Sequence, residues 1–229
     1  MAMDDQSRVF VRKLLIWYKK AARELPWRDT RNPYAILVSE FMLQQTQVSR
    51  VLEYFPRFMA RFPTIDALAR SRPKAVMEQW DGLGYYARAR NLHALAKVVS
   101  RTLHGQLPDD PVQLQELPGV GKYTAGAVAC FAYQKAVPAV DTNVRRVLSR
   151  VFGNAKFGMR NAELWRLAST LVPKNGERAW KFNQAMMELG ALVCTARVPK
   201  CQDCPVKKHC RYTARLNSRN RIHGRAHPE

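Results

Sequence analysis

The chain has 229 residues, enough to bury a core in one domain or in two small lobes. Its 38 lysines and arginines outnumber 18 aspartates and glutamates, and the formal net charge of +20 favours a polyanionic partner such as nucleic acid. No apolar run approaches the ~18–20 residues that span a bilayer. Residues 1–6 lack the basic and apolar regions of a signal peptide. We therefore expect an intracellular protein with no membrane segment.

Helical periodicity runs along most of the chain. Residues 7–25 place Phe10, Leu14 and Tyr18 on one face and basic side chains on the other, which predicts an amphipathic helix. Residues 34–53 begin apolar nearly all round, which predicts a buried helix. Further helices are predicted at residues 51–61, 64–69, 73–79, 87–103, 111–116, 124–133, 142–152, 161–171 and 177–194. No strand pattern of convincing length, repeat or low-complexity tract interrupts them, so the fold class is predicted to be all-α.

A glycine turn at residues 117–125 (LPGVGKYTA) precedes a helix of small residues. Gly119 and Gly121 permit backbone angles with positive φ and close approach of another chain. A turn that enters a helix N-terminus presents free amides at the positive end of the helix dipole, which suits a phosphate group. The turn lacks the lysine–serine pair of a nucleoside triphosphate site. Taken alone, it is equally compatible with an ordinary interhelical turn.

Glu40 lies between apolar residues of the helix predicted at 34–53. Burial penalises the charged carboxylate, so we expect a raised pKa, as suits a general acid near neutral pH. The alternative is a glutamate on a polar stripe that includes Ser39, Gln44 and Gln47.

Asp141 precedes the helix predicted at residues 142–152 and is well placed as its N-cap. Hydrogen bonds from the helix amides would keep its pKa low and its carboxylate charged. A carboxyl group in an apolar setting and another in a polar setting form the pattern that separates an acid from an electrostatic stabiliser.

The five cysteines divide into one and four. Cys130 lies in an apolar helix and is predicted to be a buried packing residue. The other four follow the spacing Cys-x6-Cys-x2-Cys-x5-Cys at Cys194, Cys201, Cys204 and Cys210. In a reducing compartment this grouping favours a metal site, and the spacing alone leaves zinc and an iron–sulfur cluster open.

The combined motifs resemble those of the helix–hairpin–helix DNA glycosylases with an iron–sulfur loop, and most closely the MutY-type adenine DNA glycosylases. The resemblance covers about residues 25–210. It rests on residues 25–28 (LPWR), 39–48 (SEFMLQQTQV), 82–88 (GLGYYAR), 117–121 (LPGVG), 140–144 (VDTNV) and 182–187 (FNQAMM), together with the four-cysteine spacing.

The resemblance implies two helical lobes with the active site in the cleft between them. Residues 30–138 would form a six-helix barrel with the helix–hairpin–helix motif, and residues 1–29 and 139–214 an iron–sulfur domain. The four clustered cysteines would bind a 4Fe–4S cluster. Residues 215–229 are basic and poor in large apolar residues. They are predicted to form a flexible tail that either attracts DNA or has no partner.

The family extrudes a nucleotide from duplex DNA and cleaves its N-glycosidic bond. The resemblance makes Glu40 the acid that protonates adenine and Asp141 the group that stabilises positive charge on the sugar, with Asn143 assisting. Tyr123 stands where bifunctional relatives carry a nucleophilic lysine, so a monofunctional enzyme is expected. The predicted DNA-binding residues are Gln45, Thr46, Tyr86, Arg88, Gly119, Val120, Gly121 and Lys122.

Two departures leave the target base open. The chain ends nineteen residues after Cys210, where the MutY type usually continues into a domain that reads 8-oxoguanine, and Thr142 replaces the usual glycine. The expected substrate is adenine opposite 8-oxoguanine or guanine. A thymine or uracil glycosylase acting opposite guanine is the alternative, and a non-catalytic DNA-binding module is the third possibility. We expect a cytoplasmic monomer, associated with the nucleoid if the source is bacterial or archaeal.

Overall fold

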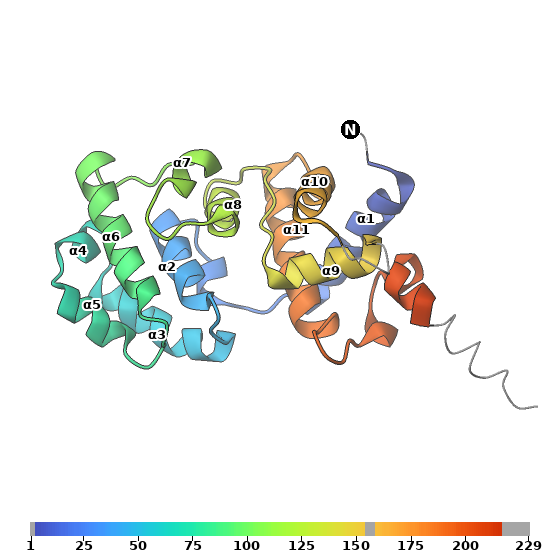
Figure 1. The fold of residues 1–229 in the computed structure, drawn as a ribbon, viewed down its shortest axis with the longest axis horizontal. Helices are drawn as coiled ribbons and strands as arrows, with labels where there is room; N and C mark the ends of the chain where they lie inside the picture. Colours follow the sequence, from blue (N-terminus) through green and yellow to red (C-terminus); the bar gives the residue numbers. More distant parts are fainter. Residues whose placement is uncertain (1–2, 154–158, 217–229) are drawn as a thin grey trace, which may run out of the picture. The chain divides into compact units, whose positions relative to one another are not determined.

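The computed structural model describes residues 3–153 and 159–216, and all of their regular elements are helical (Figure 1). No strand occurs in these two ranges, in agreement with the predicted all-α class. None of the described helices combines the length and apolar character needed to cross a membrane. The chain divides into two compact units, one of Glu24–Lys135 and the other of Met1–Arg23 with Ala136–Glu229.

The unit Glu24–Lys135 is built around α2 (Pro33–Leu43). Asn32 caps this helix by accepting hydrogen bonds from two backbone amides of its first turn, and Pro33 has the fixed φ that suits a first helical position. Nine of its residues are buried, and it packs on α3, α6 and α8. The surrounding elements are η1 (Pro26–Arg28), α3 (Val48–Arg61), α4 (Ile65–Arg70), α5 (Pro73–Trp80), α6 (Ala87–Thr102), α7 (Pro111–Gln115) and α8 (Lys122–Phe131).

The prediction of a single helix at residues 34–53 is wrong. The structure breaks it into α2 and α3, with a turn at residues 44–47 between them. Gln45 in this turn has φ of 57°, a left-handed conformation that costs a non-glycine residue about 1–2 kcal/mol. The segment has no glycine or proline, so the local sequence carries no breaking signal.

The second unit joins α1 (Asp5–Ala21) to the C-terminal part of the chain. The apolar face of α1 packs against α11 and α10, and the Phe10 ring meets the Phe152 ring edge to face with centroids 5.1 Å apart. The remaining elements are α9 (Thr142–Phe152), α10 (Asn161–Leu171), α11 (Gly176–Glu188), η2 (Leu189–Val193), η3 (Cys201–Asp203) and η4 (Lys207–His209).

The helix predicted at residues 177–194 changes character before its end. The α-helix α11 stops at Glu188, and the π-helical segment η2 carries the chain to Val193, next to the first clustered cysteine. Residues 211–216 add a short helix. Most of the predicted basic tail, residues 217–229, lies outside the described residues.

Candidate active site and cysteine pocket

Glu40 lies on α2 with only 4% of its surface exposed. The Tyr123 hydroxyl, at the start of α8, donates a hydrogen bond to its Oε2 over 2.6 Å. The two residues are 83 positions apart in sequence, and the packing of α2 against α8 brings them together. The arrangement aims a phenol at a buried carboxyl group within the unit Glu24–Lys135.

The glycine turn connects α7 to α8 beside the same helix α2. Gly119 has φ of 76°, and a Cβ there would lie 2.7 Å from the Asn91 Cβ and 3.1 Å from the Phe41 ring. Only glycine fits this position without displacing neighbours. Gly121 differs, because a Cβ there would meet nothing within 4 Å. Both glycines are exposed, as is Lys122, whereas the Val120 side chain is buried.

Two exposed segments carry the other predicted DNA contacts of this unit. Gln45 is exposed and Thr46 is half-buried in the turn between α2 and α3. Tyr86 precedes α6, and its hydroxyl donates a hydrogen bond to the Asp81 Oδ1 over 2.6 Å. Tyr85 beside it is 59% exposed and has φ of 48°, which the sequence did not indicate.

Arg88, predicted to contact DNA, is buried. Its side chain is 7% exposed, and its guanidinium donates to backbone carbonyls on both sides. Burial lowers the pKa of Arg88, because the low-dielectric surroundings disfavour the charged form. In this conformation the guanidinium is turned away from solvent. A DNA phosphate would approach from the solvent side.

Asp141 is the N-cap of α9, as predicted. Its Oδ1 accepts a hydrogen bond from the Val144 amide over 2.6 Å, and its Oδ2 accepts one from the Asn143 side chain over 3.0 Å. The expectation of a low pKa is wrong, however. Burial raises the pKa of Asp141 and outweighs the lowering by the Val144 and Asn143 donors and by nearby Arg146.

Arg146 links this carboxylate to the cysteine segment. Its guanidinium donates to the Asn143 Oδ1 over 2.7 Å, to the Gly190 carbonyl over 2.8 Å and to the Cys194 carbonyl over 2.8 Å. Gly190 must be small here, because a Cβ would lie 2.6 Å from the Asn143 Cβ. Asp141, Asn143 and the first clustered cysteine are thereby tied into one hydrogen-bonded chain.

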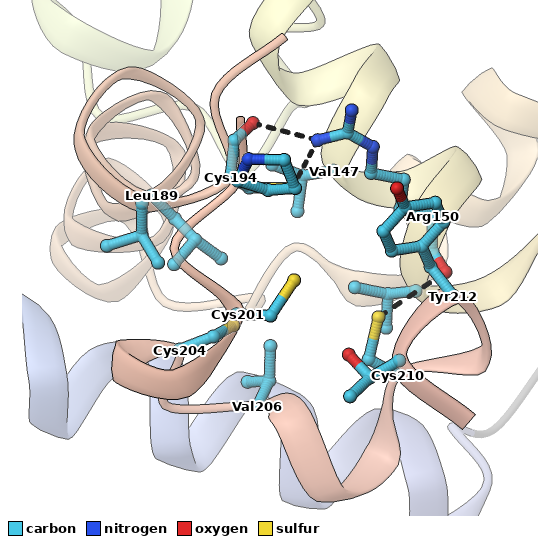
Figure 2. A pocket seen from close by; sticks show the side chains of 13 residues that line it. Val147, Arg150, Leu189, Cys194, Cys201, Cys204, Val206, Cys210 and Tyr212 are labelled. Atoms are coloured by element: carbon cyan, nitrogen blue, oxygen red, sulfur yellow. Dashed lines mark hydrogen bonds between the residues drawn. The ribbon is translucent and has the colours of Figure 1, made fainter. Parts of the chain in front are cut away.

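The four clustered cysteines line one pocket (Figure 2). Valine and leucine side chains form much of its wall, with Leu189 and Val206 among them. Burial raises the pKa of the Cys204 thiol to about 11, and burial together with neighbouring cysteines raises that of Cys201. Among the described residues, no group of three or more His, Cys, Asp or Glu side chains is placed so that it could hold a metal ion.

Arg150 closes one side of this pocket. Its Nη1 lies 3.4 Å from the Cys194 sulfur, and its own carbonyl is 3.5 Å from the Cys210 sulfur (Figure 2). The same Nη1 donates to the Thr195 carbonyl over 2.7 Å. The Tyr212 ring stacks on the guanidinium at 5.1 Å. Neither Arg146 nor Arg150 was among the site residues predicted from the sequence. The available signal was their separation by four residues in the helix that follows Asp141, which places both side chains on one helix face.

The structure therefore assembles the predicted site residues as two groups. Glu40, Tyr123 and the glycine turn belong to one unit, and Asp141, Asn143 and the cysteine pocket belong to the other.

Comparison with known proteins identifies relatives of both sequence and fold. The chain is 48% identical over 195 residues to the adenine DNA glycosylase of Mycobacterium tuberculosis (strain ATCC 25618 / H37Rv), a match that covers 84% of this chain and 64% of that protein. It therefore spans less than two thirds of that relative. The solved structure of a thermostable thymine-DNA glycosylase is 34% identical to this chain and superimposes on it with a TM-score of 0.85. The match covers 92% of this chain and 97% of the thymine-DNA glycosylase chain.

A further solved structure, a non-covalent endonuclease III–DNA complex, has a TM-score of 0.81 at 26% identity and covers 95% of this chain and 100% of its own. A family model described as HhH-GPD superfamily base excision DNA repair protein matches residues 38–170, which contain Glu40, the glycine turn and Asp141. By this match the chain is a member of the HhH-GPD superfamily of base excision DNA repair proteins.

Proposed function

We propose that the protein is a monofunctional DNA glycosylase that removes mispaired adenine, opposite 8-oxoguanine or guanine, from duplex DNA. The observation that carries this proposal is the hydrogen bond from Tyr123 to the buried Glu40 beside the glycine turn. Relatives named adenine DNA glycosylase, at 48% identity, favour adenine as the base. In the predicted division, residues 30–138 form the barrel domain and residues 1–29 with 139–214 the cluster domain.

The proposed reaction assigns separate tasks to the two carboxyl groups. Glu40 donates a proton to a ring nitrogen of the extruded base, which makes the base a better leaving group. Asp141 in its ionised form stabilises the positive charge that develops on the sugar, as the second carboxylate does in glycoside hydrolysis. Asn143 holds the Asp141 carboxylate in place through the hydrogen bond from its side-chain amide.

Tyr123 determines the outcome of the reaction at the sugar. A phenol cannot form the Schiff base by which an amine nucleophile would open the sugar ring. Its hydrogen bond to Glu40 instead orients the acid. Water instead supplies the hydroxyl group at the sugar carbon as the protonated base leaves, so the proposed product is an abasic site in an unbroken strand.

The cysteine pocket is proposed to hold a 4Fe–4S cluster through Cys194, Cys201, Cys204 and Cys210. The four thiols line a single, largely apolar pocket. Their spacing resembles that of the iron–sulfur loop in related glycosylases, which favours a cubane, in which each thiolate binds a different iron, over one zinc ion. When bound, the cluster would order the cysteine segment, to which Arg146 ties Asn143.

Duplex DNA with a mispaired base is the proposed partner. The exposed turn at Gly119 and Gly121 presents the N-terminus of α8 to a backbone phosphate, and Lys122 adds a positive charge. Gln45, Thr46 and Tyr86 would lie against the bases at the mispair. We further propose that the protein acts as a monomer in the cytoplasm, at the nucleoid if the source is bacterial or archaeal.

A thymine or uracil glycosylase acting opposite guanine is the second candidate. The thermostable thymine-DNA glycosylase is similar over 97% of its own length, which is a fuller match than the adenine relative provides. Its lower identity, 34% against 48%, makes it second.

The deciding experiment is a single-turnover assay on duplexes with A, T or U opposite 8-oxoguanine or guanine. We expect adenine release, with strand breaks appearing only after alkali. Glu40→Gln should lower the rate by at least ~10²-fold while leaving DNA affinity nearly unchanged. Release of thymine or uracil with adenine untouched would establish the second candidate instead. Wild-type rates from Glu40→Gln would remove Glu40 from the mechanism.

A further inference from the structure

Arg88 has a position that its predicted role does not explain. The side chain is buried, and no acidic side chain of the described residues pairs with it. A buried guanidinium requires compensation from hydrogen-bond acceptors. Here the acceptors are backbone carbonyls, and they come from two separate segments of the chain.

One edge of the guanidinium is bound to the end of α2. The Arg88 Nη1 donates to the Phe41 carbonyl over 3.0 Å, to the Met42 carbonyl over 2.7 Å and to the Gln44 carbonyl. The last carbonyls of a helix have no partner within the helix and form the negative end of its dipole. Arg88 therefore acts as a C-terminal cap for α2, supplied by α6.

The other edge of the guanidinium is bound to the loop before α6. The Arg88 Nη2 donates to the Leu83 carbonyl over 3.2 Å and to the Gly84 carbonyl over 3.0 Å. The Trp80 and Tyr85 rings lie 5.4 Å and 5.5 Å from the guanidinium carbon and cover it. The same side chain therefore joins the turn at residues 44–47 to the loop at residues 82–86.

Both joined segments contain backbone in the left-handed region. Gln45 has φ of 57° and Tyr85 has φ of 48°, neither of them a glycine. Such conformations persist where the surroundings hold them. The hydrogen bonds from Arg88 reach the carbonyl of Gln44, directly before Gln45, and the carbonyl of Gly84, directly before Tyr85.

We propose that Arg88 is a positioning residue that holds these two segments in the shape with which Gln45, Thr46 and Tyr86 probe the bases at the mispair. It contacts no phosphate itself. This inference rests on the proposed function for its effect on DNA, although the effect of Arg88 on the two segments belongs to the free protein.

Hydrogen exchange in the DNA-free protein tests the positioning directly. Arg88→Met replaces the guanidinium and all its hydrogen-bond donors with an apolar side chain. Arg90→Met is the matched control, because it removes an exposed arginine from the same helix. We expect faster amide exchange at residues 44–47 and 82–86 in Arg88→Met only, with the protection of α8 retained. Arg88→Lys, which keeps the charge and some donors, should fall between Arg88→Met and the wild type.

DNA binding and excision separate this role from a phosphate contact. We expect Arg88→Met to keep the wild-type salt dependence of affinity, because a lost phosphate contact would lower the slope of log K against log salt by about 0.9. The single-turnover rate should fall at least about tenfold, because displacement of the two segments would misalign the extruded base with the catalytic groups. The preference between adenine opposite 8-oxoguanine and adenine opposite guanine should shrink as well. Simple loss of folded protein would lower both substrates' amplitudes equally and leave that preference unchanged.

Three results would overturn the proposal: exchange unchanged at both segments, a salt slope reduced by one contact, or an unchanged preference with amplitudes lowered in parallel. Failure of the wild type to release any base would instead contradict the proposed function. In that case the exchange experiment still decides whether Arg88 holds the two segments.

Discussion

At the scale of single residues, Asp141 combines two demands that oppose each other. As the cap of α9 it accepts hydrogen bonds from Val144 and Asn143, which favour the carboxylate. Its burial disfavours the same charged form and dominates, so the pKa of Asp141 is raised. A buried carboxylate that lowers the stability of the folded state is expected at a position where its charge takes part in a reaction.

Asp141→Asn should therefore stabilise the protein while removing its activity. Because the folded pKa of Asp141 is raised, ionisation favours the unfolded state, and its contribution to stability falls as pH rises from about 3.8 through the folded pKa. Asparagine avoids this penalty and can still accept from the Val144 amide, although it loses the hydrogen bond from the Asn143 side chain. We expect a higher Tm than wild type at pH 7, a difference that closes in acid, and a single-turnover rate lower by at least ~10²-fold. Equal or lower stability at neutral pH would contradict the role of burial.

At the scale of elements, the turn between α7 and α8 uses its two glycines differently. Gly119 is required by the fold, because it has positive φ and because a Cβ there would clash with Asn91 and Phe41. Gly121 has open space where a side chain would begin. The second position leaves room for something outside the chain, as the proposed phosphate contact needs.

The two glycines can be tested as a matched pair. Gly119→Ala should lower the free energy of unfolding by at least about 1–2 kcal/mol, since it adds left-handed strain and a clash. Gly121→Ala should leave stability within about 0.5 kcal/mol of wild type yet weaken duplex binding, because its methyl group occupies the approach to the amides. Denaturant titration and equilibrium binding measure the two effects. Equal losses of stability in both variants would refute the distinction.

The segment after η2 gives a second element-scale prediction. Protein purified without oxygen should contain iron and sulfide at about four atoms each per chain. Cys201→Ser should lower the iron content, whereas Cys130→Ala should retain it, because Cys130 is buried in α8 and does not line the pocket. Zinc in place of iron, or equal iron in both variants, would contradict the proposed cluster.

At the scale of the whole molecule, the net charge of +20 attracts polyanions before any specific contact forms. Lysines and arginines that neutralise phosphates release counterions from DNA, so affinity falls as salt rises. We expect log K for duplex DNA to fall with log salt at a slope of about −0.9 for each phosphate contacted, with several contacts in total. Binding measured from low to high salt checks this, and a nearly flat dependence would show that the charge serves another purpose.

Helix signals in the sequence were most reliable where caps and patterns agreed. The predicted bounds of α9 and α10 match the structure, because Asp141 caps the first and clear amphipathic patterns run through both. The predicted packing role of Cys130 is likewise confirmed by its burial. The break after α2 was missed, since residues 44–47 carry no glycine or proline and the turn is held by Arg88 from another helix. The roles of Glu40, Asp141 and the predicted DNA contacts stay predictions.

The sequence by itself determined the helical class, the glycine turn, the grouping of four cysteines and the positions of the two carboxyl groups. These properties follow from residue spacing, charge and local propensity, which can be read from the sequence without knowledge of the fold. Only the tertiary structure decided that Tyr123 reaches Glu40, that Arg88 turns inward to two loops and that burial raises the pKa of Asp141. Each depends on which distant segments surround a side chain, because desolvation and hydrogen-bond partners are set by packing and not by neighbours in sequence.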